Sequence, residues 1–223
     1  MSIYNETIIE AVAAMIPQFI SGKRLAHTLA VEQECIALSA LFLTHPALMS
    51  EEDAYKLRIA ALLHDITKEK NTEEHAALCA KYRIPLTDYE LSAPKVLHSK
   101  TAPPLARETV NRQFGTNIVD DTVCDAIRTH TTGAAQMSLI GKLLYLADYI
   151  EPTRTFEDCV TLRHAFYDGI DRHLNDPDAL CRHLDRTMIL SFDMTIRDLV
   201  AACAPIDENT TAARNALLFA AHR

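Results

Sequence analysis

Apolar residues recur at helical spacing along most of this 223-residue chain. In residues 59–66, and again in residues 140–147, leucine, isoleucine and alanine occupy positions i, i+3, i+4 and i+7, which lie on one face of an α-helix. The sequence contains no alternating strand pattern of useful length. The spacing predicts an all-α fold with helices at residues 3–18, 22–43, 51–66, 72–82, 103–114, 119–130, 137–150, 157–170, 177–200 and 209–221.

Proline and turn residues divide these predicted helices into short segments. Proline disfavours a helical conformation in the residue before it and has no backbone donor. Breaks are accordingly expected at Asn71, at Pro85, at Pro94, at Pro103-Pro104 and at Pro152. None of them is a long flexible linker. We therefore predict a single all-helical domain over residues 1–223, with a core at about 20–152 and a helical extension at about 153–223.

Glycine is scarce in this chain. It contains 5 glycines, whereas average usage of about 7% would supply about 15. The chain has neither a GxGxxG motif nor a GxxxxGK[ST] motif, so glycine-rich loops that hold phosphate through backbone N–H groups are excluded. Any phosphate chemistry would have to use side chains and a metal ion.

Charge restricts the partners of the protein. The formal net charge is −8, which argues against a general nucleic-acid coat and against binding to an anionic membrane surface. An acidic protein can still hold one small polyanionic ligand at a local site. A homodimer is compatible with these features.

Cysteine usage and the first residues of the chain favour a cytoplasmic protein. The beginning of the chain lacks a basic segment with a cleavage site, and no apolar run approaches the roughly 18 residues of a membrane span. The cysteines form no CxxC pair, so we expect reduced thiols in the core at Cys35, Cys79, Cys124, Cys159, Cys181 and Cys203.

Acidic residues interrupt two apolar helical runs. His64 and Asp65 follow the apolar run that begins at Ile59, and Asp148 is the only charged residue in 143–150. Burial of an unpaired carboxylate costs on the order of several kcal/mol, so each aspartate needs a cation, either an Arg or Lys side chain or a metal ion. For His64 and Asp65 the alternative is a polar helix end that reaches solvent.

Further histidines lie in similar surroundings at His27, His98 and His130. Taken singly, each is more often a core or capping histidine than a ligand. Together with the aspartates they offer imidazole and carboxylate donors from at least four helices, a mixture that suits iron, manganese or zinc, while the lack of thiolates argues against structural zinc. The remaining histidines are expected at the surface: His45, His75, His164, His173, His183 and His222.

The order His27, His64-Asp65, Asp148 resembles the H…HD…D signature of the HD-domain metal-dependent phosphohydrolases. The flanking words KRLAHT (23–28), ALLHDITK (61–68), IRTHTTG (127–133) and YLADYIEP (145–152) together resemble the YqeK family, bacterial enzymes that use iron to split diadenosine tetraphosphate symmetrically into two ADP. The resemblance covers about residues 20–155. It implies an HD-domain helical bundle with a helical C-terminal extension.

The resemblance also implies a metal centre. Its ligands would be His27, His64, Asp65 and Asp148, with iron (Fe2+ or Fe3+) as the expected ion and manganese or zinc as alternatives. Water acidified by the metal would attack a phosphorus atom. Asp65 would then act in catalysis as a metal ligand, and Lys68 would act through the positive charge of its amine.

Substrate contacts carried over from the resemblance are Arg24, Lys68, His98, His130 and Arg154. Two of these, His98 and His130, are also candidates for holding a second metal ion. The ligand would be a dinucleoside polyphosphate or a nucleotide similar to ADP or GDP. Candidates for stacking on the base are Tyr149, Phe156 and Tyr167.

Two alternatives to a symmetrical tetraphosphatase stay open. The chain could be another HD phosphohydrolase, acting on nucleoside mono- or triphosphates or on cyclic dinucleotides. The cyclic dinucleotide group is disfavoured because no Gly-Tyr-Pro word lies near a histidine. The chain could also be a nucleotide-sensing helical module without catalysis, although intact candidates at all four metal positions argue against it.

Overall fold

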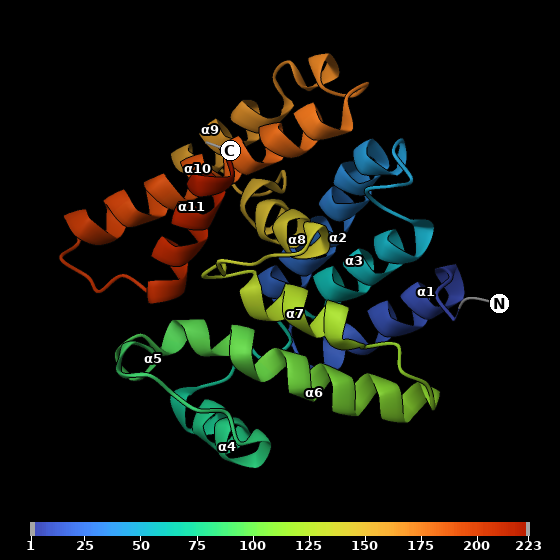
Figure 1. The fold of residues 1–223 in the computed structure, drawn as a ribbon. Coiled ribbons are helices and arrows are strands. Elements are labelled where there is room, and N and C mark those ends of the chain that lie inside the picture. Colours follow the sequence, from blue (N-terminus) through green and yellow to red (C-terminus); the bar gives the residue numbers. More distant parts are fainter. Residues whose placement is uncertain (1–2, 222–223) are drawn as a thin grey trace.

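The computed structural model describes residues 3–221 (Figure 1), and this part of the chain is helical without a β-strand. The all-α prediction is confirmed. The α-helices are α1 (Glu6–Met15), α2 (Gly22–Leu43), α3 (Glu51–Leu63), α4 (Thr72–Tyr82), α5 (Asp88–Ser92), α6 (Leu97–Phe114), α7 (Asp121–Thr129), α8 (Leu139–Ile150), α9 (Glu157–Tyr167), α10 (Pro177–Ala201) and α11 (Glu208–Ala221). Short 3₁₀ helices lie between the α-helices at Ile16–Gln18, Pro94–Val96 and Ile170–Arg172.

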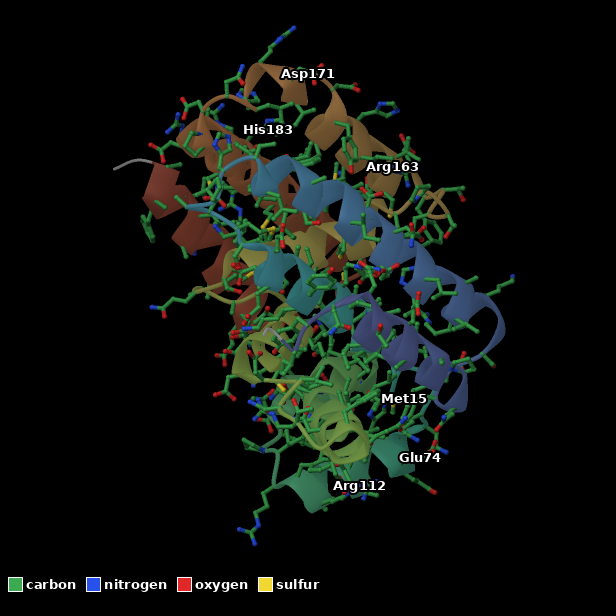
Figure 2. The ribbon with its side chains drawn as sticks, turned by 90° about the vertical axis from the view of Figure 1, so that its right-hand side faces the viewer. Met15, Glu74, Arg112, Arg163, Asp171 and His183 are labelled. Carbon is green, nitrogen blue, oxygen red and sulfur yellow. The ribbon has the colours of Figure 1, made fainter. Side chains whose placement is uncertain are left out.

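The apolar helix α8 lies at the centre of the bundle. It packs against α2, α3 and α7 on one side and against α9 and α10 on the other. Figure 1 shows α4, α5 and α6 at one end of the molecule and α9, α10 and α11 at the other. In Figure 2 the same two ends are marked by Arg112 and Glu74, and by Asp171 and His183. The aspartate on α8 is thereby placed where both groups of helices meet.

Helix α6 differs most from the expected segments. A break was predicted at Pro103-Pro104, but the helix begins at Leu97 and continues through both prolines. Each interior proline removes a backbone hydrogen bond. Ala102 and Ala106 are nevertheless fully buried and α6 packs along α7, so tertiary packing outweighs the local preference. The short helix α5, which begins with a capping box at Thr87, was not predicted.

Helix α3 ends earlier than the sequence predicted. Its last residue is Leu63, and His64 is the C-cap residue. His64 and Asp65 therefore lie in the turn that follows the helix, where the amide of Lys68 donates to the Asp65 carbonyl at 2.8 Å. This turn lies in the interior of the protein because both side chains are almost completely buried.

Two sets of burial predictions need correction. All six cysteines are free, and four are buried as expected, but Cys181 is only half-buried and Cys203 is exposed, since it follows the end of α10. Among the histidines expected at the surface, His164 is exposed and three are half-buried, whereas His75 is buried on α4 with Nδ1 3.1 Å from Oγ1 of Thr101. His222 lies outside the described residues.

Among residues 3–221, none of the helices has both the length and the apolar character needed to cross a bilayer.

Candidate metal centre

Asp65 lies at the centre of a cluster of nitrogen donors. Its Oδ2 accepts a hydrogen bond of 2.7 Å from Nη1 of Arg24 on α2. Its Oδ1 lies 3.3 Å from Nε2 of His98 and 3.8 Å from Nε2 of His130, which come from α6 and from the end of α7. Burial opposes ionisation, but His64, His98 and Lys68 outweigh it and hold the pKa of Asp65 well below its usual range. The carboxylate is therefore the ionised form.

Three histidines of the cluster are oriented in the same way. The Nδ1 atoms of His64, His98 and His130 each donate to the carbonyl three residues earlier, at 2.6, 2.7 and 2.6 Å. A carbonyl can only accept, so Nδ1 carries the proton and, in a neutral ring, Nε2 presents its lone pair to the centre. These local backbone contacts thus orient the Nε2 atoms of three imidazole rings toward the centre, where they can act as ligands.

Protonation differs among these rings. Burial lowers the pKa of His98, and it lowers the pKa of His130 to about 4, so both rings are neutral at pH 7. Burial acts in the same direction on His64, but the adjacent Asp65 outweighs it and raises the pKa. The Nε2 atom of His64 is buried without a hydrogen-bond partner. In the neutral ring a cation would satisfy the lone pair of this atom, because an unpaired buried polar atom carries a desolvation penalty.

His27 on α2 lies between two carboxylates. Its Nε2 is 2.9 Å from Oδ1 of Asp148, and its Nδ1 is 3.1 Å from Oε1 of Glu151. The Glu151 side chain is fully buried and also accepts hydrogen bonds from the amide and the hydroxyl of Thr153. Glu151 therefore orients His27, as carboxylates commonly do for histidine ligands. Arg163 holds this turn by donating to the carbonyls of Ile150, Glu151 and Arg154.

The predicted metal ligands and two further histidines come together in three overlapping groups. Within each group the donor atoms lie no more than 4.8 Å apart. The groups are His27, His64 and Asp65; His64, His130 and Asp148; and Asp65, His98 and His130. Imidazole and carboxylate donors suit iron, manganese and zinc. The residues present therefore fit a metal ion, and the unpartnered Nε2 of His64 is the observation that supports this most directly.

Three cationic side chains surround the cluster. Besides Arg24, Arg154 donates from Nη2 to Oδ1 of Asp148 at 2.7 Å. The amine of Lys68 lies 3.0 Å from Nε2 of His98, and burial lowers its pKa. The pKa of Asp148 is well below its usual range because His27 and Arg154 outweigh the effect of burial. Positive charge thus lines the rim of the centre.

Every site residue predicted from the sequence lies in this cluster or on its rim. Sequence reasoning missed Glu151 and Thr131, whose hydroxyl lies 3.1 Å from Nε2 of His98 and 3.0 Å from Nε2 of His130. A signal for Glu151 was present, since it follows directly on an apolar helix. Thr67, expected to be a polar neighbour, donates to the His98 carbonyl at 3.2 Å. Of the three stacking candidates, Tyr167 instead donates to Glu34.

The same residues lie in the part of the chain that matches a known protein family. The model of the HD domain family matches residues 24–153, which is more than half of the chain and includes His27, His64, Asp65 and Asp148. The chain belongs to the HD domain family. This HD domain chain is 34% identical over 149 residues to a protein from Bacillus subtilis named bis(5'-nucleosyl)-tetraphosphatase, symmetrical, covering 66% of the chain and 71% of that relative. The predicted family resemblance is confirmed.

Two further proteins cover more of the HD domain chain. A relative of the same name from Halalkalibacterium halodurans is 29% identical over 205 residues, which cover 92% of the chain and 94% of that relative. A crystal structure from Clostridium acetobutylicum, titled as a predicted HD superfamily hydrolase involved in NAD metabolism, has a TM-score of 0.75 and 28% identity, with 95% of this chain and 97% of that chain covered. The likeness therefore includes the C-terminal helices.

Proposed function

We propose that this HD domain chain is a metal-dependent hydrolase that cleaves diadenosine tetraphosphate symmetrically into two ADP. The observation that carries the proposal is the buried histidine and aspartate cluster with an unpartnered His64 nitrogen, surrounded by three cationic side chains. Metal-ligating donors next to cations suit a polyphosphate. The names of the two tetraphosphatase relatives support the choice of this substrate.

The residues that would hold the ion are His27, His64, Asp65 and Asp148. We propose iron, because mixed imidazole and carboxylate donors without thiolate suit it, and manganese and zinc are the alternatives. When bound, such an ion acidifies water and polarises phosphoryl oxygens. A second ion would use His98 and His130, whose Nε2 atoms lie 3.0 Å apart.

The protein itself would supply orientation and charge. Glu151 holds His27 at its position, and the backbone carbonyls hold His64, His98 and His130 with Nε2 toward the centre. Arg24, Lys68 and Arg154 would neutralise the charge that spreads over the phosphoryl oxygens during the reaction. The buried site would make these interactions stronger than they are in water.

The product pattern tests the reaction. The protein would be purified without oxygen, loaded with iron and incubated with diadenosine tetraphosphate, and the nucleotides would be separated by chromatography. ADP as the only product supports the proposal. AMP with ATP, or no turnover, contradicts it. Parallel incubations with nucleoside mono- and triphosphates test the alternative HD phosphohydrolase activity.

A second experiment tests the ligand set. Replacing His64→Ala or Asp148→Ala should remove bound metal, as measured by elemental analysis, together with activity, while the helical circular dichroism spectrum is retained. His164→Ala is the matched control because His164 is exposed on α9. Normal metal content in the first two variants would mean that the proposed ligands are wrong.

A cytoplasmic location is also proposed, and the six free cysteines support it.

A further inference from the structure

A pocket of about 300 Å³ opens between the start of α4 and the segment that precedes α6. Three lysines line it, Lys68, Lys70 and Lys95, together with the buried His75. None of the residues that line it in the described part of the chain is an aspartate or a glutamate. Three ammonium groups around one pocket, in a protein whose net charge is −8, favour an anionic ligand there.

Two of the three lysines have unused hydrogen-bond donors. The Lys68 amine lies 3.0 Å from Nε2 and 3.3 Å from Nδ1 of His98, but Nδ1 donates to the Lys95 carbonyl, so only Nε2 can accept from Lys68. An ammonium group has three donors, and no carboxylate of the described residues forms an ion pair with this one. Lys95 is exposed, and within residues 3–221 its amine also forms no ion pair. Lys70 differs, because its amine pairs with Glu74 at 3.2 Å.

Lys68 also connects this pocket to the candidate metal centre. The donor atoms of the centre follow one another in a row, in which Oδ1 of Asp148 lies 3.9 Å from Nε2 of His64, and this Nε2 lies 3.5 Å from Oδ2 of Asp65. Oδ1 of Asp65 is in turn 3.3 Å from Nε2 of His98, and the Lys68 amine is 3.0 Å from the same Nε2. The pocket therefore adjoins the His98 end of this row.

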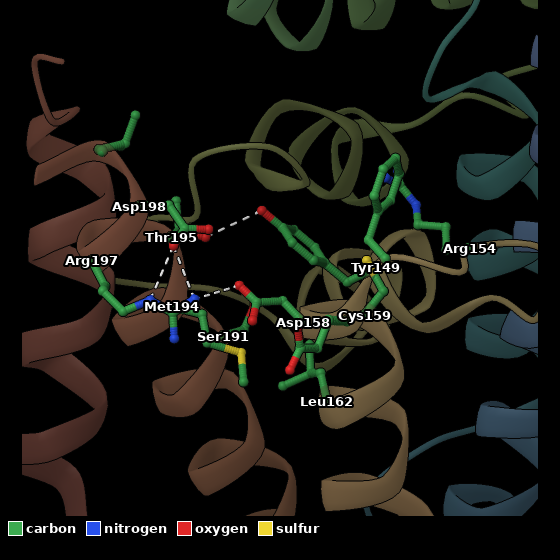
Figure 3. Close-up of a pocket in the computed structure, with 13 residues that line it drawn as sticks. Tyr149, Arg154, Asp158, Cys159, Leu162, Ser191, Met194, Thr195, Arg197 and Asp198 are labelled. Atoms are coloured by element: carbon green, nitrogen blue, oxygen red, sulfur yellow. Dashed lines mark hydrogen bonds and ion pairs between the residues drawn. The ribbon is translucent and has the colours of Figure 1, made fainter. Parts of the chain in front are cut away.

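Arg154 lies at the other end of the row, where it donates to Oδ1 of Asp148 at 2.7 Å. A larger cavity, of about 640 Å³, opens there between α9 and α10, and Figure 3 shows Arg154 and Tyr149 on the same side of it. Positive charge thus lies at both ends of the centre, with Arg154 at one end and Lys68 and Lys95 at the other. A chain of phosphates across the centre would have a cation on each side of the bond that breaks.

We propose that the pocket beside α4 binds the phosphates of the half of the dinucleoside polyphosphate that lies away from Arg154, with the ammonium groups of Lys68 and Lys95 on their oxygens. This inference rests on the proposed function, because symmetrical cleavage leaves two phosphates on each side of the broken bond. The volume is at the lower end of the range of about 300–1,000 Å³ for small-molecule sites, so the pocket accommodates phosphate groups while the attached nucleoside extends past its rim. Lys95 thereby favours substrates whose phosphate chain continues beyond the centre.

The test uses a substrate analogue that resists the reaction. Diadenosine tetraphosphate with a methylene group in place of the central bridging oxygen cannot be hydrolysed to two ADP, and it spans both ends of the centre, whereas inorganic phosphate reaches only the metal ion. Binding of each ligand to the metal-loaded protein would be measured by calorimetry for the wild type, Lys95→Met and Lys81→Met. Lys81 is a matched control because it is exposed at the other end of α4, outside the pocket.

Lys95→Met should weaken binding of the analogue about tenfold, which corresponds to the loss of about one hydrogen bond from a charged group, and leave binding of inorganic phosphate unchanged. Lys81→Met should change neither affinity. Elemental analysis should find normal metal content in both variants, because the backbone carbonyl of Lys95, and not its side chain, orients His98.

Four results would overturn the assignment. They are unchanged affinity for the analogue in Lys95→Met, an equal loss in Lys81→Met, an equal loss of affinity for inorganic phosphate, and no binding of the analogue by the wild type. The proposed function can fail separately. A wild type that binds the analogue through Lys95 but leaves diadenosine tetraphosphate intact would contradict the tetraphosphatase activity and retain the phosphate site. Cleavage to ADP without any effect of Lys95→Met on binding would do the reverse.

Discussion

Gly133 connects the site to the C-terminal helices. It follows His130 in the loop after α7 and has a φ of +72°, which is in the left-handed region that favours glycine. A Cβ atom at this position would lie 2.7 Å from Cζ of Phe192 and 2.9 Å from Cβ of Ala213. Both neighbours are buried, on α10 and α11. We predict that Gly133→Ala strongly destabilises the protein.

The magnitude has two sources. An L side chain in the left-handed region costs about 1–2 kcal/mol, and overpacking of a filled site costs about 1–3 kcal/mol more. The free energy of unfolding should therefore fall by about 3 kcal/mol. Gly115→Ala is the matched control, because Gly115 has a φ of +66° and no atom within 4 Å of its Cβ position. It should lose only the backbone contribution, about 1 kcal/mol.

Urea unfolding followed by circular dichroism measures both variants. The difference between them isolates the contact between the loop after His130 and the helices α10 and α11. Equal destabilisation of the two variants would refute the reasoning, since it would mean that Phe192 and Ala213 move aside at no cost. Elemental analysis of the folded Gly133→Ala protein would show whether the loop also affects metal binding.

Three further predictions concern the centre itself. Glu151→Gln should weaken metal binding by about 10- to 100-fold, because a neutral amide orients His27 less well; unchanged affinity in a metal titration would contradict this. The pKa of His130 is about 4 in the folded protein and about 6.5 in the unfolded chain. Between these pH values the unfolded state binds more protons than the folded state, so the free energy of unfolding decreases as pH falls from 6.5 to 4. Over this pH range the free energy of unfolding of the metal-free wild type should fall by about 3 kcal/mol more than that of His130→Asn, as measured by denaturant titrations. Parallel pH profiles of the two proteins would disprove this prediction. Lys68→Met should lower kcat/KM about 100-fold without changing metal content. Lys70→Met should leave kcat/KM unchanged, because Lys70 pairs with Glu74 on the outside of the protein. Similar kinetics for both variants would exclude a role for Lys68.

Some helices were predictable because their signals are local. Helices α2 and α4 have the bounds that apolar spacing and turn residues indicated, Gly22–Leu43 and Thr72–Tyr82. Helix α6 was not predictable, because the two prolines are local signals for a break whereas its burial against α7 is not encoded locally. The same reason explains His75, whose polar neighbours in the sequence gave no sign of its burial against Thr101.

The sequence by itself determined the all-α class, the absence of a glycine phosphate loop and the candidates His64, Asp65 and Asp148. These features follow from residue type and spacing, because a charge inside an apolar helical run must find a partner wherever the helix packs. Only the tertiary structure decided which partners meet. Glu151 contacts His27 across 124 positions of sequence, and Arg24 contacts Asp65 across 41. Such contacts depend on how distant helices pack, and no local pattern encodes them.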